Sequence, residues 1–377
     1  MSTNPMHVRI TRVETVPLCI PFRTPFKIAQ GAARPSAEVF IVRLHTDNGL
    51  EGIGETQAWR RQGSYETLQS LQATVQDHFA PLLLGRSPFD IGAIMPALEE
   101  AVYRSLYAQA AISDALYDLQ GQLLGVPVHA LIGGRCRDTL TACAVLTIKS
   151  TLEETIAGAR DYHERGFRAF TVKVGVDPAA DVENVRELRN QFPDAVLRVD
   201  ANAGMDFDSA LRLVQRLAPF DLDAAEQLLP AWDVQGMAEL ARRSPIPLMA
   251  DECVGTDHDL IEVIRARAAS IVQTKIAKNG GIWHGRRLWH IAAAAGLRIY
   301  PGNHPSTSVA TAAAAHLGAA WPGALLEGAF AVGLLNLAED IVAQPLRMQG
   351  PSLHVPQGPG LGVRLDERQL QKFRVAL

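Results

Sequence analysis

The chain has 377 residues, of which 47% are hydrophobic and 20% are charged, and its formal net charge is −4. This composition is typical of a soluble globular protein with two domains or one elaborated barrel, and it gives no support for binding to nucleic acid or to an anionic membrane. The four cysteines have no C-x-x-C spacing, so we expect free thiols and a cytoplasmic location.

The first part of the chain has the pattern of an α+β unit. Residues 39–44 and 50–55 are two apolar strand patterns joined by Asp47-Asn48-Gly49, which predicts a hairpin. Residues 22–35 are rich in proline, glycine and small residues, and we expect them to form a long exposed loop of the kind that serves as a lid. Apolar spacings of three and four predict a helix over 108–124.

The second part alternates apolar runs with helical patterns, about one pair every 25 residues. We expect strands over residues 140–146, 169–174, 195–200, 223–226, 247–251, 270–275, 298–300 and 324–327. Helical patterns lie between them, for example over 152–165, 179–191, 209–217 and 282–295. Eight such strands predict an α/β fold with a TIM-type β/α barrel. A doubly wound sheet is the rival, but it needs a glycine-rich turn after its first strand, which this chain lacks.

Residues 299–326 contain no Asp, Glu, Lys or Arg, and they could be mistaken for a membrane span. Three prolines and several Ser, Thr, Asn and His residues interrupt this stretch. Backbone groups left unpaired by such breaks are not tolerated in lipid. We therefore expect a buried strand, loop and helix here.

Five of the predicted strands end in a charged side chain, namely Lys173, Asp200, Glu226, Asp251 and Lys275. Successive members are separated by 27, 26, 25 and 24 residues, which is one β/α unit each. Parallel strands therefore bring all five to one mouth of the barrel, where the catalytic groups of such barrels lie.

Three converging carboxylates cannot all stay ionised without a cation. Asp200, Glu226 and Asp251 are all-oxygen donors, which suit Mg²⁺, with Mn²⁺ as an alternative. Lys173 and Lys275 would face each other across this metal. The arrangement predicts abstraction or donation of a proton α to a carboxylate, with the metal stabilising the enediolate. A nearby cation would also lower the pKa of a lysine and make a neutral amine base available.

Longer motifs surround these residues and carry a resemblance to a known family. They are Gly52-Ile53-Gly54-Glu55, Thr171-Val172-Lys173-Val174-Gly175, Val199-Asp200-Ala201-Asn202, Glu226-Gln227, Ala250-Asp251-Glu252 and Lys275-Ile276-Ala277-Lys278-Asn279-Gly280-Gly281. Together with the closing stretch 355–362, they resemble the muconate lactonizing enzyme (muconate cycloisomerase) subgroup of the enolase superfamily, over nearly the whole chain.

The resemblance implies a (β/α)₇β barrel over residues 131–339. It also implies an α+β capping domain made of residues 1–130, on which residues 340–377 pack. Asp200, Glu226 and Asp251 would be Mg²⁺ ligands, and Lys173 and Lys275 the acid/base pair. Members of the subgroup include muconate cycloisomerases, racemases or epimerases of dipeptides and N-acylamino acids, o-succinylbenzoate synthases, and epimerases or dehydratases of proline derivatives. A homo-oligomer is implied by the resemblance alone.

The chain departs from the family pattern at two positions. The second barrel strand usually carries Lys-x-Lys, whereas here Thr171 replaces the first lysine, as it is also replaced in relatives that act on betaine-like cationic substrates. Ser306 stands where cycloisomerases and dipeptide epimerases commonly have a glutamate. Glu327, in contrast, matches an acidic position of the cycloisomerases at the end of the eighth strand.

Other residues near the predicted mouth are candidates for supporting or substrate-binding roles. Asn202 and Gln227 follow two ligands and would orient them. Glu252 could contact the opposite lysine or form an ion pair in the barrel wall. His304 lies in a polar loop at the mouth and could bind substrate or stabilise that loop. Residues 59–61 could line the distal end of the substrate.

We therefore expect an Mg²⁺-dependent isomerase that acts on a small carboxylate, with a muconate cycloisomerase-like reaction first. Racemisation or epimerisation of an N-acylamino acid, dipeptide or proline betaine is the alternative, and dehydration of a hydroxy acid is third. A metal-dependent hydrolase would need a His-x-His motif early in the barrel, and the eleven histidines contain none. A non-catalytic binding barrel is disfavoured because both lysines are present.

Overall fold

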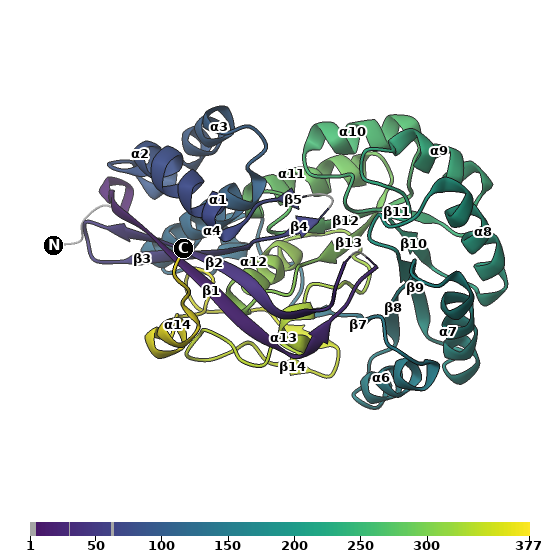
Figure 1. The fold of residues 1–377 in the computed structure, drawn as a ribbon. Helices are drawn as coiled ribbons and strands as arrows, with labels where there is room; N and C mark the ends of the chain where they lie inside the picture. The colour runs from purple at the N-terminus through teal and green to yellow at the C-terminus, as the bar shows by residue number, and fades with distance from the viewer. Residues whose placement is uncertain (1–4, 30, 62–63) are drawn as a thin grey trace.

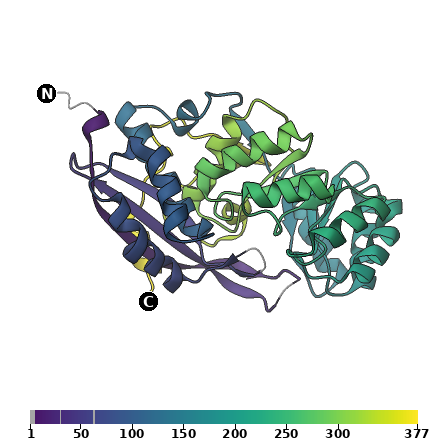
Figure 2. The same cartoon turned by 90° about the horizontal axis from the view of Figure 1, so that it is seen from above.

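An antiparallel sheet with helices on one side and a parallel half-barrel with helices outside it form the two domains of the chain (Figures 1 and 2). The structure is a computed structural model that describes residues 5–29, 31–61 and 64–377. The predicted α/β class, with a TIM-like barrel and a capping domain, is confirmed.

The capping sheet has the strand order β1-β2-β3, with β1 at Ile10–Phe26, β2 at Arg34–Thr46 and β3 at Glu51–Gln57. The expected hairpin over 39–55 is confirmed as β2 and β3. The loop expected over 22–35 is shorter in the structure, because β1 extends to Phe26 and β2 begins at Arg34, and the two strands pair up to these residues. Residue 30 lies outside the described residues. The prolines of β1 are tolerated because β1 is an edge strand and a register shift lies between Pro21 and Phe26.

Helices cover one face of the capping sheet. They are α1 (Leu68–Ala73), α2 (Ala80–Leu83), α3 (Ile91–Ala101), α4 (Leu106–Leu124) and α5 (Val128–Leu131), and a short hairpin of β4 (Arg60–Arg61) and β5 (Ser64–Tyr65) precedes them. The helix expected over 108–124 is α4, which packs against β3 on one side and a barrel helix on the other. Nearly all of α4 is buried, so this helix is the core of the domain interface.

The barrel sheet has seven parallel strands in sequence order. They are β7 (Ala144–Leu146), β8 (Ala169–Lys173), β9 (Val196–Asp200), β10 (Ala224–Glu226), β11 (Leu248–Ala250), β12 (Ile271–Lys275) and β13 (Arg298–Gly302). The helices between and after them are α6 (Leu152–Glu164), α7 (Pro178–Gln191), α8 (Phe207–Leu217), α9 (Val234–Arg243), α10 (Asp257–Ala266), α11 (Gly281–Ala294) and α12 (Ser308–Ala319). All but α11 begin after an Asp or Thr whose side chain accepts a backbone N–H, so local sequence sets these helix starts.

Two of the eight expected strands differ in the structure. The strand expected over 140–146 is split, because β6 (Thr139–Thr141) pairs antiparallel with the C-terminal tail and only β7 joins the barrel. The strand expected over 324–327 is not assigned as a strand. Instead, Leu326 N bonds to Ile299 O, and Cys143 N bonds to Gly328 O, so this segment joins β13 to the start of β7. A few hydrogen bonds of this segment therefore connect the two edges of the half-barrel.

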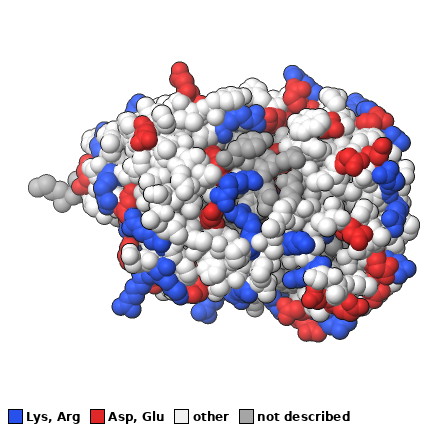
Figure 3. Space-filling view, viewed as in Figure 1, with Lys and Arg blue, Asp and Glu red and all other residues white. Residues whose placement is uncertain are grey.

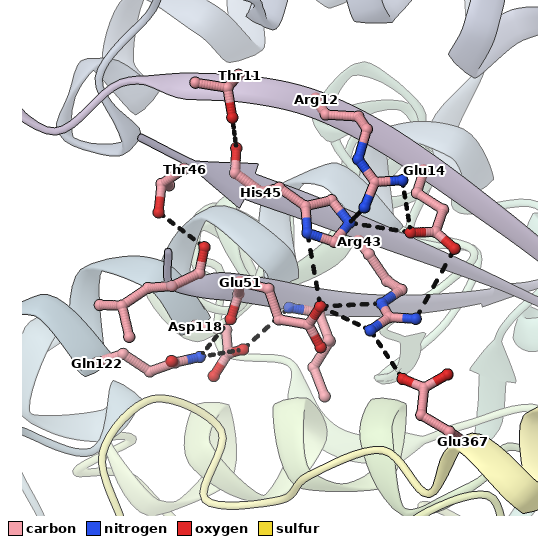
Figure 4. A network of polar contacts seen from close by, with 12 residues as sticks. Thr11, Arg12, Glu14, Arg43, His45, Thr46, Glu51, Asp118, Gln122 and Glu367 are labelled. Atoms are coloured by element: carbon pink, nitrogen blue, oxygen red, sulfur yellow. Dashed lines mark hydrogen bonds and ion pairs between the residues drawn. The ribbon is translucent and has the colours of Figure 1, made fainter. Parts of the chain in front are cut away.

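The C-terminal tail packs against the capping domain. It contains α13 (Val332–Asn336), β14 (Met348–Gln349), β15 (Ser352–His354) and α14 (Glu367–Phe373). In Figure 4, Arg43 of β2 forms ion pairs of 2.8 Å with both Glu51 of β3 and Glu367 of α14. The edge strand β1 is also bridged to the tail at Leu18 and Arg374. The predicted boundaries at 130 and 340 remain predictions.

Acidic and basic side chains are interspersed on the face of the molecule shown in Figure 3. This distribution agrees with the small net charge of the sequence. Within the part of the chain that the structure describes, we find no helix with the length and apolar character needed to cross a membrane.

Candidate active site

The five charged residues predicted from the strand spacing lie together at the carboxyl ends of the barrel strands. Lys173, Asp200, Glu226 and Lys275 are the last residues of β8, β9, β10 and β12, and Asp251 directly follows β11. Strand pairing places Lys173 beside Asp200 and Asp200 beside Glu226. The lysines stand on β8 and β12, which are separated in the sheet by three strands.

A cavity of about 40 Å³ lies between these strand ends and the capping domain. It is lined by four of the five residues, Lys173, Asp200, Glu226 and Lys275. Phe26 and Ile28, at the tip of the β1–β2 ribbon, line the same cavity, and Figure 1 shows this ribbon reaching across to the barrel strands. The capping domain thus contributes apolar groups to a cavity whose charged groups come from the barrel.

Each lysine forms an ion pair with one carboxylate. Lys173 pairs with Asp200, and Lys275 pairs with Asp251, whose Oδ1 also lies 3.3 Å from Lys278 Nζ. Burial disfavours the charged form of Lys275, but the neighbouring carboxylates outweigh it and raise its pKa. The pKa of Lys173 is raised in the same way, chiefly by Asp200 and then Glu226. Both lysines are therefore ammonium groups when the carboxylates have no other cation beside them.

The carboxylates of the site can still accept a cation. Burial first, and then the charges of Asp200 and Asp251, raise the pKa of Glu226 well above its ordinary value. Glu226 Oε1 is buried and accepts no hydrogen bond from the described residues, and the buried Asp251 Oδ1 has the 3.3 Å ion pair with Lys278. In those residues no three His, Cys, Asp or Glu side chains are already arranged as a closed metal-binding group. The unpartnered oxygen of Glu226 and the mutual repulsion of the carboxylates fit a divalent cation that would compete with the lysines for these carboxylates.

Two of the predicted supporting residues, Asn202 and Gln227, hold the carboxylates in place. Asn202 donates from Nδ2 to Asp200 Oδ2 (3.1 Å) and to Glu252 Oε1 (3.2 Å). Gln227 accepts through Oε1 from the backbone N of Asp251 (2.9 Å), and so fixes the turn that carries this carboxylate. Burial and then the charge of Asp251 raise the pKa of Glu252 to about 8. These contacts agree with orienting roles for Asn202 and Gln227.

Thr171 and His304 line the cavity, whereas Ser306 lies behind it. Thr171 Oγ1 lies 3.1 Å from Tyr300 Oη, so hydroxyl groups occupy the place of the usual lysine. The His304 ring packs between Trp59, at 4.8 Å, and Tyr107, at 5.5 Å between ring centroids. Burial, followed by the charge of Lys275, lowers the pKa of His304 well below its ordinary value, so this imidazole is neutral.

Glu327 does not line the cavity. Its Oε2 pairs at 3.2 Å with Arg198, which precedes Asp200 by two residues and therefore lies deeper in the barrel. Arg198 also pairs with Asp223, at the amino end of β10. The structure thus places Glu327 on the side of the barrel away from the lysines.

Several residues that line the cavity were not predicted from the strand ends, namely Val145, Gln273, Tyr300, Asn303, Ala329 and Val332. Gln273 could have been found, because it lies two residues before Lys275 and therefore on the same face of β12. Trp59 also lines the cavity, as proposed from the sequence. Arg60 instead pairs with Glu38, and the side chain of Arg61 lies outside the described residues.

Two family models match the chain. The model described as mandelate racemase/muconate lactonizing enzyme, N-terminal domain, matches residues 10–133, and the model described as enolase C-terminal domain-like matches residues 154–369. The chain belongs to the mandelate racemase/muconate lactonizing enzyme family of the enolase superfamily. The resemblance predicted from the strand-end motifs is confirmed, and the chain is an isomerase of this superfamily, a cycloisomerase or a racemase/epimerase.

Relatives of both reaction types match over almost their full length. Muconate cycloisomerase 1 of Pseudomonas putida is 35% identical over 354 residues, which cover 93% of this chain and 94% of the relative. N-succinyl-L-Arg/Lys racemase of Bacillus cereus is 30% identical over 370 residues, which cover 98% of each. The structure of muconate lactonizing enzyme from Pseudomonas fluorescens complexed with muconolactone superposes with a TM-score of 0.93 at 33% identity, covering 98% of this chain and 100% of that one.

Proposed function

We propose that the protein is a Mg²⁺-dependent isomerase that moves a proton to or from the carbon α to a carboxylate. The observation that carries the proposal is the placement of Lys173 and Lys275 on separate strands around one cavity that Asp200 and Glu226 also line. Asp200, Glu226 and Asp251 would hold the metal. When bound, Mg²⁺ would supply the positive charge that stabilises an enediolate.

In this scheme the two lysines exchange the α-proton with the substrate. In a cycloisomerisation, one lysine delivers the proton to the α-carbon, and in a racemisation one lysine removes it while the other returns it to the opposite face. Phe26 and Ile28, from the capping domain, line the cavity and would limit the access of water to the carbanion. Asn202 and Gln227 would keep the carboxylates in position during the reaction.

We propose cycloisomerisation of a muconate-like acid as the first candidate reaction, because muconate cycloisomerases are among the relatives with 35% identity. Racemisation or epimerisation of an amino-acid derivative is the second candidate, since both lysines face the cavity and racemases match at 30% identity. The cytoplasmic location and the homo-oligomeric state expected from the sequence remain predictions.

The test is deuterium incorporation in D₂O with Mg²⁺. The protein would be incubated with pools of carboxylates, comprising cis,cis-muconate, substituted muconates, N-succinyl amino acids, dipeptides and proline betaines. Mass spectrometry would then detect α-deuteration or turnover to a lactone. Exchange without net racemisation would favour cycloisomerisation. Absence of both exchange and turnover in every pool would refute the proposed substrates.

A further inference from the structure

Asn303 lines the active-site cavity and carries a hydrogen-bond donor that has no partner among the described residues. It directly follows β13 and is only 3% exposed. Its Oδ1 accepts from the backbone N of His304 and from Ser306 Oγ, both at 3.0 Å. Because a backbone N–H can only donate, this pair of bonds fixes which end of the amide is oxygen. The other end, Nδ2, is buried and bonds to none of the described residues.

The orientation of Asn303 is controlled from the capping domain. Gln57, the last residue of β3, donates from Nε2 to Ser306 Oγ at 2.9 Å and to Pro305 O at 2.6 Å. Since Ser306 Oγ accepts from Gln57, its own proton is directed to Asn303 Oδ1. Gln57 and Ser306 are only 2% and 1% exposed, so water does not compete for these bonds. A chain of neutral hydrogen bonds therefore runs from β3 to the free Nδ2 group.

A buried N–H without an acceptor costs roughly 1–3 kcal/mol, and such groups in native proteins usually have a partner outside the chain. Among the described residues that line the cavity, the cationic side chains are Lys173 and Lys275, and Lys173 and Lys275 are already paired with carboxylates. A second oxygen on a substrate would therefore need a neutral donor, and Asn303 Nδ2 is a buried donor at this cavity with no acceptor among the described residues.

We propose that Asn303 binds substrate by donating from Nδ2 to an sp² oxygen remote from the reacting carboxylate, with Gln57 and Ser306 as its positioning residues. This inference rests on the proposed function and narrows its substrate class to carboxylates with a second carbonyl or carboxylate oxygen. The amide oxygen of an N-acylamino acid and the distal carboxylate of a muconate share this chemistry. Ser306, at the position where relatives commonly have glutamate, keeps the relay uncharged.

The first test is steady-state kinetics of Asn303→Asp, which keeps Oδ1 and replaces the donor with an acceptor of the same size. On a substrate found by the D₂O assay, KM should rise about 10-fold or more, with a smaller change in kcat, because the lost bond stabilises bound substrate. Ser306→Ala, which frees the amide to rotate, should raise KM less. The effects of the two changes should be non-additive in the double variant. Asn190→Asp, on the exposed face of α7, is the matched control and should behave as wild type.

Running cis,cis-muconate and N-acetylated amino acids as separate arms identifies which oxygen Asn303 recognises. A KM that is unchanged in both Asn303→Asp and Ser306→Ala would overturn the inference while leaving the proposed function intact. Because Asn303→Asp could destabilise its loop, thermal unfolding of each variant would be measured. If Asn303→Asp does not fold, the KM of Ser306→Ala alone tests the inference.

A binding measurement separates this inference from the proposed function. Calorimetric titration of the Mg²⁺-loaded wild type and Ser306→Ala would compare 4-oxopentanoate with pentanoate, which differ by one carbonyl oxygen. We expect the wild type to bind 4-oxopentanoate about 10-fold more tightly and Ser306→Ala to lose most of that preference. Equal binding of the two acids, or binding of neither, would contradict the role of Asn303 even if no pool is turned over. A preference in an enzyme that turns over no pool would refute the proposed substrates and leave this inference intact.

Discussion

Replacing Asp114 by asparagine should make the protein more stable at neutral pH. Asp114 lies in the buried helix α4 and accepts through Oδ1 from the backbone N of Ile282 (2.9 Å), in the first turn of α11. Its Oδ2 is buried and makes no hydrogen bond with the described residues. Burial raises the pKa of Asp114 from 3.8 to about 8, although the bond from Ile282 opposes this change.

The magnitude follows from this pKa. A carboxyl whose folded-state pKa lies above its unfolded value stabilises the fold fully only below the unfolded pKa, and this contribution is lost as the pH rises toward the folded pKa. Each pH unit between about 4 and 8 therefore costs about 1.4 kcal/mol, or about 4 kcal/mol at pH 7. Asparagine keeps the Oδ1 acceptor and does not titrate, but its buried NH₂ group costs roughly 1–3 kcal/mol.

The unfolding free energy of Asp114→Asn minus that of the wild type should rise by about 3 kcal/mol between pH 5 and pH 7. The fixed cost of the NH₂ group does not affect this change, because it is the same at both pH values. Urea unfolding followed by tryptophan fluorescence at several pH values measures this difference. Asp208→Asn, at an exposed position of α8, is the matched control. Parallel stability curves for the wild type and Asp114→Asn would refute the reasoning.

Three further predictions concern the barrel. Lys275→Ala should lower α-proton exchange by about 10²-fold or more, because a positioned acid/base group contributes at least that much; near-wild-type exchange would argue against an acid/base role. EDTA should abolish turnover and Mg²⁺ should restore it, and full activity in chelator would argue against a metal-dependent reaction. Arg198→Met should lower the unfolding free energy by about 2–3 kcal/mol, because Asp223 loses a buried guanidinium and keeps only Arg298, and Glu327 loses its ion pair; an effect no larger than that of the exposed Arg265→Met, about 1 kcal/mol or less, would contradict this.

The positions of the charged residues could be predicted because a β/α unit has a nearly constant length. Once Asp200 and Lys275 were assigned to strand ends, the barrel geometry required them to meet, and they do. The helix starts were also accessible, since Thr256 and Asp206 are local N-caps.

Contacts between distant segments could not be predicted from local patterns. Gln57 and Ser306 are separated by 249 residues, and nothing near either residue indicates the other. The proline, glycine and small residues of 22–35 suggested a long loop, but pairing along β2 outweighs local propensity and continues β1 to Phe26. Glu327 was assigned to the mouth by analogy with the family. In the structure, the segment around Gly328 has an irregular backbone, and the Glu327 side chain binds Arg198.

Because the tail pairs with β1, the capping sheet of a newly made chain is complete only after the tail has been synthesised. Backbone groups of Pro17 and Pro21, on the outer edge of the capping sheet, accept hydrogen bonds from Val375 N and Ala338 N. During synthesis on the ribosome, that edge is made more than 300 residues before its partners. We therefore expect the nascent chain to carry an unpaired strand edge until residues 338 and 375 emerge, which is the interval in which such an edge can recruit other chains.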